Sequence, residues 1–420
     1  MIYVPSRMGQ LNRRALLRQL QKLGVASRAD LAKSLGMSQP TAGKIVDELI
    51  AVDVIEEVAE PGAENGFRNG NGNGDGSIPL GRPGRQLRLN QSQARFLGIQ
   101  LGIKTTTVTG LTLSTANEDY WPASFEVADG EPNPAKVWEK KLTLATKMFA
   151  VENILGVLLS VPGVVDEAAN RILFSPNIHW TEKINLAGIV QRVWNVPVFL
   201  VQEERALALG HHLANPDCED FLLVDFGEGV GGAIIVEGKP LANPLPISGE
   251  IGHTPVPGNN RRCGCGAVGC METLVSLRGM LESFAVAVPE VENSWSALSE
   301  YILQNGVKPW LGQALDAAAA AIAGALNVLG LRRLVITGNL TELPPVVMQY
   351  LSHAVQNGAM WARFGEVECV SAPRRRMAGL VAVGIDRLIV PDHNGKHFVP
   401  SKKAKDAKPD KEDRKLTTTT

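Results

Sequence analysis

The stretch EIGHTPVPGNNRRCGCGAVGCME, residues 250–272, carries the most specific chemical pattern in the chain. It holds one imidazole, His253, followed after nine residues by three thiols in the order Cys-x-Cys-x4-Cys, at Cys263, Cys265 and Cys270. One imidazole and three thiolates form a closed tetrahedral ligand set, which predicts a structural zinc ion. The glycines between the cysteines give the backbone the freedom to fold these ligands around one ion.

The length, net charge and cysteine content of the chain indicate what kind of protein carries this site. A length of 420 residues predicts two or three domains. The net charge of −1 gives no global attraction to nucleic acid, so DNA binding would need a local patch. Five cysteines, three of them clustered, fit a reducing cytoplasm better than a disulfide framework. We expect no signal peptide at the N-terminus and no membrane span in the glycine-broken apolar run 317–331.

The first sixty residues predict a winged helix-turn-helix. Apolar residues recur at helical spacing over residues 11–23, Ser27 is placed to cap a second helix, and Ser38 a third over residues 39–52. Two short helices joined at a glycine, the second opening with small polar residues, are typical of DNA-binding domains. A strand over residues 54–58 would begin the wing.

The recognition helix would present polar side chains to base edges, with nearby basic groups on phosphates. The residues expected to face the groove are Gln39, Thr41, Ala42 and Lys44. The candidate phosphate contacts are Arg13, Arg14, Arg28 and Lys33. The alternative for this region is a small helical bundle that contacts protein.

A change of composition separates this domain, residues 1–60, from the rest. Residues 61–80 alternate Gly and Asn and predict a flexible loop, which opens a linker over 61–90. The basic sequence GRPGR follows, and its Arg82 and Arg85 are candidates for insertion into a narrow minor groove. An ordinary basic linker is an equal alternative.

Residues 91–390 alternate strand and helix patterns, which predicts an α/β architecture in two lobes. Expected strands lie in LGIQLGIKTTTVTGLTL, ILGVLLSVPGVVD, PVFLVQ and the hairpin FLLVDFGEGVGGAIIVEGKPL. Expected helices include residues 135–149, 186–194 and 310–329. The charged low-complexity tail, residues 391–420, is expected to be disordered.

The pattern ExGH followed by CxCGxxGCxE, with the upstream helix-turn-helix, resembles the ROK family of repressors, open reading frames and sugar kinases. VPGVVD at 161–166 and SPNIHW at 175–180 also resemble it, and the likeness extends over residues 10–390. It implies an actin-like, ribonuclease-H-like ATPase fold in dimers or tetramers. Members with the N-terminal extension are typically sugar-responsive regulators, and members without it are typically kinases.

The same resemblance implies a sugar pocket with a particular set of side chains: Asn177, Glu203, Glu250, His253 and Glu272. Carboxylates that accept and amides that both donate and accept suit vicinal hydroxyl groups. His253 would bind zinc through one ring nitrogen and face the sugar with the other. For each carboxylate the alternative is an ordinary surface glutamate.

The kinase branch needs groups that this sequence replaces. Gln100 stands where an aspartate is expected to hold hydrated magnesium, which prefers charged oxygen. Glu228 places a negative charge in the glycine-rich loop 227–231, where a hydroxyl should meet phosphate. The pair Gln202-Glu203 replaces Asn-Asp, which lengthens the catalytic base by one methylene. Arg205 and Asn339 are further departures, so we expect a degenerate kinase site with no catalytic residue.

These patterns predict a cytoplasmic, zinc-containing DNA-binding repressor that responds to a sugar or sugar derivative. It would bind operator DNA as a homodimer or homotetramer. One alternative is an active ATP-dependent sugar kinase that carries a DNA-binding extension. Another is a regulator whose degenerate pocket senses a protein partner.

Overall fold

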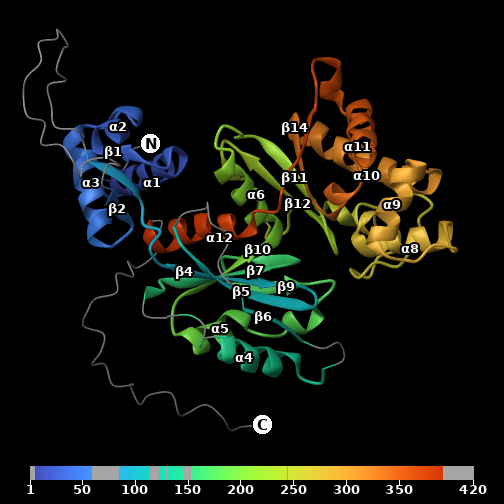
Figure 1. Ribbon diagram of the computed structural model, residues 1–420, viewed down its shortest axis with the longest axis horizontal. Coiled ribbons are helices and arrows are strands. Elements are labelled where there is room, and N and C mark those ends of the chain that lie inside the picture. The colour runs from blue at the N-terminus through green and yellow to red at the C-terminus, as the bar shows by residue number, and fades with distance from the viewer. Residues whose placement is uncertain are drawn as a thin grey trace, which may run out of the picture.

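The chain folds into a small N-terminal domain beside two larger lobes, as the computed structural model in Figure 1 shows. The structure describes residues 5–58, 85–113, 123–127, 131–145, 147, 149, 153–243 and 245–390. The predicted flexible loop at 61–80, Arg82 and the predicted disordered tail at 391–420 lie outside the described residues.

Three helices form most of the N-terminal domain: α1 (Pro5–Leu23), α2 (Arg28–Ser34) and α3 (Gln39–Ala51). Both predicted caps are confirmed. Ser27 and Asp30 form a reciprocal capping box on α2, and the Ser38 hydroxyl accepts from the Thr41 N–H at the start of α3. Such caps satisfy backbone donors that the first helical turn leaves without partners.

A three-stranded sheet in the order β1-β3-β2 completes this domain. Its strands are β1 (Ala26–Ser27), β2 (Ile55–Val58) and β3 (Gln86–Leu89). β2 and β3 pair antiparallel, from Ile55 opposite Leu89 to Val58 opposite Gln86. The predicted linker boundary at residue 90 is therefore corrected, because residues 86–89 belong to the N-terminal sheet.

The first lobe is built on a five-stranded sheet in the order β10-β7-β4-β5-β6. Its strands are β4 (Phe96–Leu101), β5 (Thr105–Leu111), β6 (Ala123–Glu126), β7 (Gly156–Val161) and β10 (Val198–Gln202). β4, β5 and β6 pair antiparallel, whereas β7 and β10 join β4 in parallel. Every residue of β7 is buried, as expected of a parallel strand covered on both faces.

The second lobe repeats this pairing pattern in a sheet of order β13-β12-β11-β14-β15. Its strands are β11 (Phe221–Phe226), β12 (Val230–Val236), β13 (Lys239–Pro240), β14 (Arg333–Gly338) and β15 (Glu368–Ser371). β11, β12 and β13 pair antiparallel, and β14 and β15 continue in parallel. A small separate ribbon pairs β8 (Val164–Asp166) with β9 (Arg171–Phe174). The predicted α/β architecture in two lobes is thus confirmed.

Helices cover both sheets (Figure 1). They are α4 (Pro134–Ala145), α5 (Leu186–Trp194), α6 (Glu203–Ala214), α7 (Glu272–Val275), α8 (Leu277–Ala287), α9 (Trp295–Asn305), α10 (Pro309–Leu329), α11 (Pro345–Gly358) and α12 (Arg376–Gly384). Among the described residues, α10 alone is long and apolar enough by composition to cross a membrane. Half of that apolar window is buried inside the protein, where Leu315 and Ile322 are fully covered, as in a core helix.

Two helices connect the lobes to the N-terminal domain. α6 and α12 pack so closely that a Cβ on Gly379 would lie 1.8 Å from the Ala206 carbonyl oxygen. A Cβ on Gly210 would lie equally close to the Arg375 carbonyl. Only glycine permits this approach at both crossings. One apolar cluster then runs from α12, through Leu380, to Leu20 of α1.

Candidate functional site

A cleft lies where the two sheets face each other at the carboxyl ends of their parallel strands. Gln100 lies near the end of β4, Glu203 follows β10, and Asp225 lies near the end of β11. Ligands in open α/β folds bind at such strand ends. The cleft encloses about 170 Å³, comparable to a cavity of about 150 Å³ that admits benzene. It therefore has room for one six-membered ring.

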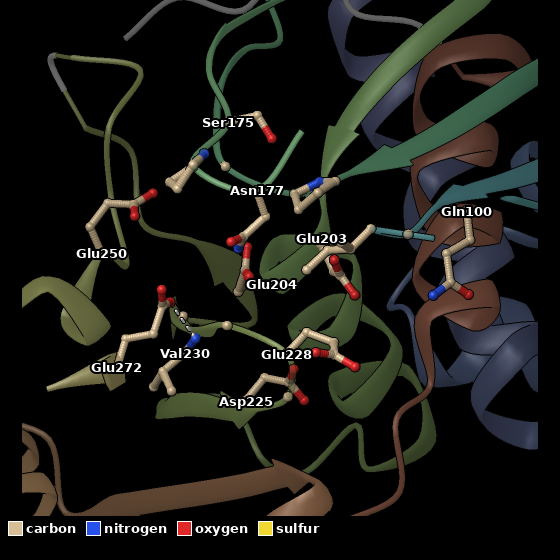
Figure 2. Close-up of a pocket in the computed structure, with 18 of the residues that line it drawn as sticks. Gln100, Ser175, Asn177, Glu203, Glu204, Asp225, Glu228, Val230, Glu250 and Glu272 are labelled. Carbon is tan, nitrogen blue, oxygen red and sulfur yellow. Dashed lines mark hydrogen bonds between the residues drawn. The ribbon is translucent and has the colours of Figure 1, made fainter. Parts of the chain in front are cut away.

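The five predicted sugar residues all line this cleft. Asn177 comes from the loop after β9, and Glu203 comes from the first turn of α6. Glu250 and His253 come from a turn of 3-10 helix at residues 251–253, and Glu272 begins α7. Figure 2 shows the side chains of Asn177, Glu250 and Glu272 around one space. Segments almost a hundred residues apart in the sequence therefore meet at this wall.

The knot, residues 250–272, lies close to the first lobe at Gly264. A Cβ on Gly264 would lie 2.9 Å from the Pro176 carbonyl oxygen and 3.5 Å from the Asn177 amide oxygen. The neighbouring Ser175 is 1% exposed, lines the cleft, and its hydroxyl has no hydrogen-bond partner among the described residues. A buried hydroxyl without a partner is uncommon in proteins and suits a ligand oxygen.

The knot brings its four predicted metal ligands together. One ligand atom from each of His253, Cys263, Cys265 and Cys270 lies within 4.8 Å of all the others. The Cys265 and Cys270 sulfurs are 3.6 Å apart, close to the roughly 3.8 Å that two thiolates about 2.3 Å from a tetrahedral zinc ion would show. The donor set therefore fits a closed metal site.

The orientation of the imidazole is also defined. His253 Nδ1 lies 3.5 Å from the Cys263 sulfur, whereas Nε2 lies 3.6 Å from a Glu250 carboxylate oxygen. Burial raises the pKa of the Cys263 thiol to about 12 in the absence of a cation. A thiolate at this position at neutral pH therefore requires a bound cation.

A second part of the cleft wall is the glycine loop, Gly227-Glu228-Gly229-Val230-Gly231, between β11 and β12, in the same lobe as the knot and adjoining it. Side chains of the protein lie against its glycines, of which Gly227 is buried while Gly229 and Gly231 are half-buried and line the cleft. A Cβ on Gly227 would meet the Arg374 guanidinium at 2.3 Å, one on Gly229 the Glu272 carboxylate at 2.9 Å, and one on Gly231 the Glu204 carboxylate at 2.6 Å.

Two backbone donors of the glycine loop are engaged as well. The Val230 N–H donates to Glu272 Oε2 at 2.9 Å, the dashed line in Figure 2, and the Gly227 N–H donates to the Gly229 carbonyl at 2.8 Å. Successive N–H groups of this kind form a concavity that binds anions. Here the Glu272 carboxylate accepts a hydrogen bond from one of those donors, the Val230 N–H.

Ion pairs hold both arginines that line the cleft. Arg374 donates two hydrogen bonds, of 2.7 and 2.9 Å, to Asp225, which also accepts from the Thr337 hydroxyl at 2.7 Å. Arg376 pairs with Glu203, the residue at the predicted position of the degenerate base. The Glu203 carboxylate therefore already accepts a hydrogen bond from a guanidinium group of the protein.

The departure at Arg205 also has a structural explanation. Arg205 pairs with Glu167 at 2.8 Å and lines a second hollow on the other side of Gln202. Its positive charge therefore belongs to the β8–β10 region and not to the cleft.

Sequence reasoning missed Glu204, the next residue along α6. Its carboxyl lies among the carboxylates of the cleft (Figure 2). Burial, and then the negative charge of Glu203, raise the pKa of Glu204 well above its usual range, with Glu250 and Asp225 adding further charge. Burial also raises the pKa of Glu250. Arg374 and Arg376 were missed too, because the short polar run at 373–376 carries no periodic or spacing signal.

Only some of the residues predicted to contact DNA are exposed at the surface of the N-terminal domain. Gln39, Thr41 and Lys44 are exposed on the first turns of α3. Ala42 is fully buried in the domain core, so its selection as a groove contact is wrong. The α3 residues facing inward recur as Ala42, Ile45, Val46 and Leu49, a spacing that assigns Ala42 to the buried face.

The candidate phosphate contacts differ in availability. Lys33 is exposed. Arg13 pairs with Glu48, and Arg28 lies 2.7 Å from Asp47 and 3.3 Å from Glu57. Arg14 instead contacts the lobes, at Asp386.

Arg85, at the start of β3, pairs with Glu57 of β2. It therefore lies beside Glu57, next to the Val58–Gln86 end of the β2–β3 pair.

Comparison with known proteins identifies the group to which the chain is related. The sequence profile described as "ROK family" matches residues 126–382, more than half of the chain. The chain belongs to the ROK family. The crystal structure described as a ROK family transcriptional regulator, homolog of the E. coli MLC protein, superposes with a TM-score of 0.68 at 19% identity, covering 90% of this chain and 97% of that one.

Two curated ROK relatives are named as regulators. The xylose repressor of Caldicellulosiruptor bescii is 26% identical over 303 residues, 69% of this chain and 71% of that protein. The DNA-binding transcriptional dual regulator NagC of Escherichia coli K12 is 25% identical over 381 residues, 84% of this chain and 86% of that protein.

The lobes also share their fold with a ROK kinase. The ROK family glucokinase from Streptomyces griseus, in complex with glucose and AMPPNP, gives a TM-score of 0.55 at 19% identity, covering 69% of this chain and 98% of the kinase. The predicted actin-like fold is therefore confirmed.

Proposed function

We propose that this ROK protein is a DNA-binding transcriptional repressor that binds a sugar in its cleft and does not phosphorylate it. The observation that carries the proposal is the difference between the two cleft walls. The sugar-facing groups converge around open space, whereas the side chains of Arg374, Glu272 and Glu204 lie against the glycines of the loop that would receive nucleotide phosphates. Relatives named xylose repressor and NagC support the regulatory assignment.

Zinc completes the proposed site. The knot's His253 Nδ1 and the thiolates of Cys263, Cys265 and Cys270 would hold it in a closed tetrahedral set. Zinc in such a set stabilises the local fold and offers no open position for substrate. His253 then presents its Nε2 side to Glu250, so the metal fixes the ring beside the sugar-facing carboxylate.

DNA recognition is proposed for the first turns of α3. Gln39, Thr41 and Lys44 are exposed there, and Lys33 on α2 is a candidate phosphate contact. A homodimer would place two such helices on the half-sites of an inverted repeat, in the cytoplasm where the chromosome lies.

Two helices give a physical route from the cleft to this domain. α6 begins with Glu203 in the cleft, and just beyond its end Asp217 pairs with Lys22 of α1 at 2.6 Å. α12 begins with Arg376 in the cleft. Beyond it, Asp386 pairs with Arg14 at 2.8 Å and with Arg18 at 3.6 Å.

Because α6 and α12 touch backbone to backbone, they would move as one unit. A sugar that binds one arrangement of the lobes more tightly would shift the orientation of the N-terminal domain.

The first test is selection of genomic DNA fragments by the full chain, followed by titration of the selected site. We expect Gln39→Ala to lower affinity by about 1–3 kcal/mol, the cost of losing one good base contact. The matched control, Gln304→Ala, changes an exposed amide on α9 and should have no effect. Failure to select any DNA site would refute the regulatory assignment.

The second test asks whether sugar and DNA are coupled. A sugar that stabilises the protein should change its affinity for the selected DNA by about 5- to 150-fold. Asp386→Asn should reduce that change, since it removes a negatively charged partner of Arg14 and Arg18. Asp316→Asn, on the far lobe beside Tyr350, should leave it intact. Equal coupling in both variants would rule out the route through α12.

A further inference from the structure

The charge of the cleft restricts the ligand it accepts. Its lining holds six carboxyl groups, from Glu203, Glu204, Asp225, Glu228, Glu250 and Glu272, against two guanidinium groups. Both guanidinium groups are already paired, Arg374 with Asp225 and Arg376 with Glu203. The metal cluster beside the cleft adds no positive charge, because three thiolates exceed the charge of one divalent zinc ion.

A backbone feature that would attract an anion, the glycine loop, is already used in part by the protein itself. The Val230 N–H of the glycine loop donates to Glu272, and the space above Gly229 is filled by that same carboxylate. Glu228, exposed on the same loop, adds a negative charge at the rim of the cleft. A phosphate group entering here would have to displace a protein carboxylate and then lie among the others.

The hollow that continues from the cleft gives no alternative seat for an anion. It is lined by the cations Lys104 and Arg278, but also by Glu228, Glu272 and Glu282. Arg278 lies 3.5 Å from Glu282. The carboxylates therefore outnumber the cations in this extension as well.

Hydroxyl groups, in contrast, find suitable partners. Carboxylate oxygens accept hydrogen bonds from sugar hydroxyls, and the amide of Asn177 both donates and accepts. The Ser175 hydroxyl, buried and without a partner among the described residues, adds a donor and an acceptor beside Asn177. These groups suit a ring with several hydroxyl groups and no anionic substituent.

We infer that the effector is an unphosphorylated monosaccharide, neutral or carrying a free amine, and that the cleft rejects the phosphate ester of the same sugar. The inference rests on the proposed function, since it names the chemical class of ligand for the same cleft. Glu228 and Glu272 are the residues that set this specificity. Glu272 accepts the Val230 N–H, which would otherwise be available to an anion. Glu228 repels a phosphate group at the rim of the cleft.

The test is a thermal-shift and calorimetric panel on the full chain. It uses glucose, xylose, N-acetylglucosamine and glucosamine, and the 6-phosphates of the three hexoses. We expect at least one unphosphorylated hexose to bind about 100-fold more tightly than its own 6-phosphate. A 6-phosphate that binds as tightly as its parent would overturn the inference and leave sugar sensing intact. No binding by any member would overturn the proposed sugar response itself.

A variant that removes charge without changing size distinguishes electrostatic repulsion of the phosphate from its steric exclusion. Glu228→Gln keeps the size of the side chain and removes its charge. We expect it to raise the affinity for the 6-phosphate relative to the parent sugar by about tenfold. Glu219→Gln, an exposed glutamate outside the cleft, is the matched control and should leave the ratio unchanged. An unchanged ratio in Glu228→Gln would show that charge at the rim does not set the specificity.

Discussion

The two walls of the cleft contain the same kinds of residue, but the polar groups of each wall have different roles. On the knot wall, carboxylate and imidazole groups line open space, and the cluster of four predicted metal ligands lies in the same segment. On the glycine-loop wall, side chains of the protein lie where a Cβ on each of Gly227, Gly229 and Gly231 would point. A binding wall keeps its polar groups available, whereas a wall whose groups are satisfied internally contributes rigidity. The variants below test this difference, in decreasing order of expected effect.

The largest effect is expected from the metal cluster. Cys265→Ser removes one of four ligands, and we expect loss of about one equivalent of zinc and of about 5 kcal/mol in unfolding free energy. Elemental analysis and urea unfolding measure both. Cys369→Ser changes a cysteine outside the cluster and should retain the metal. Wild-type protein without zinc, when purified in the absence of chelator, would contradict the assignment.

On the glycine-loop wall the largest effect is expected from Arg374→Ala. Asp225 is 9% exposed in its side chain and would lose its charged partner. Breaking a buried pair costs about 3–5 kcal/mol, and we expect about 2–3 because Arg374 is itself 31% exposed. Urea unfolding gives the value. Arg332→Ala, an exposed arginine 3.6 Å from Glu368, should cost less than about 1 kcal/mol. Equal losses would mean that the Asp225 pair does not hold this wall.

A smaller effect is expected from filling the loop. Gly231→Ala would place a methyl group 2.6 Å from the Glu204 carboxylate. We expect a loss of about 1–2 kcal/mol, because overpacking forces neighbouring side chains to move. Gly324→Ala lies in α10 with open space around the new methyl group and should stabilise by up to about 1 kcal/mol. A neutral Gly231→Ala would show that Glu204 does not lie against the loop.

The smallest effect is a change in pH dependence. The pKa of Glu204 is raised in the folded protein, so its contribution favours folding at low pH and is lost as pH rises above about 4.5. Glu204→Gln should therefore raise stability at pH 8 more than at pH 4.5, by about 1 kcal/mol or more. Unfolding in urea at both pH values gives the comparison. An equal change at the two values would place the carboxylate in a solvated environment.

The periodicity of apolar residues and the helix-capping residues predicted much of the fold. The bounds of α5 follow from its apolar pattern, and those of α2 and α3 from Ser27 and Ser38. The pattern did not reveal β3, because residues 86–89 pair with a strand almost thirty residues earlier. Local propensity cannot report such a long-range pairing.

The site was predictable where its chemistry is local in sequence. The metal ligands lie within eighteen residues, and their spacing alone predicted the cluster that the structure shows. The pairing of Asp225 with Arg374 joins residues 149 positions apart, so no spacing rule could find it. The prediction for Ala42 was wrong for a different reason. Ala42 was chosen for its position on the recognition helix, although the neighbouring apolar residues of α3 assign it to the buried face.

The most direct test of the account is an assay for ADP release with Mg-ATP and each sugar that stabilises the protein. The covered glycine loop and the paired Glu203 predict no sugar-dependent ADP above the blank. Turnover of about 1 per second or faster, within the usual range for enzymes, would contradict it. That result would identify the chain as a sugar kinase with a DNA-binding extension.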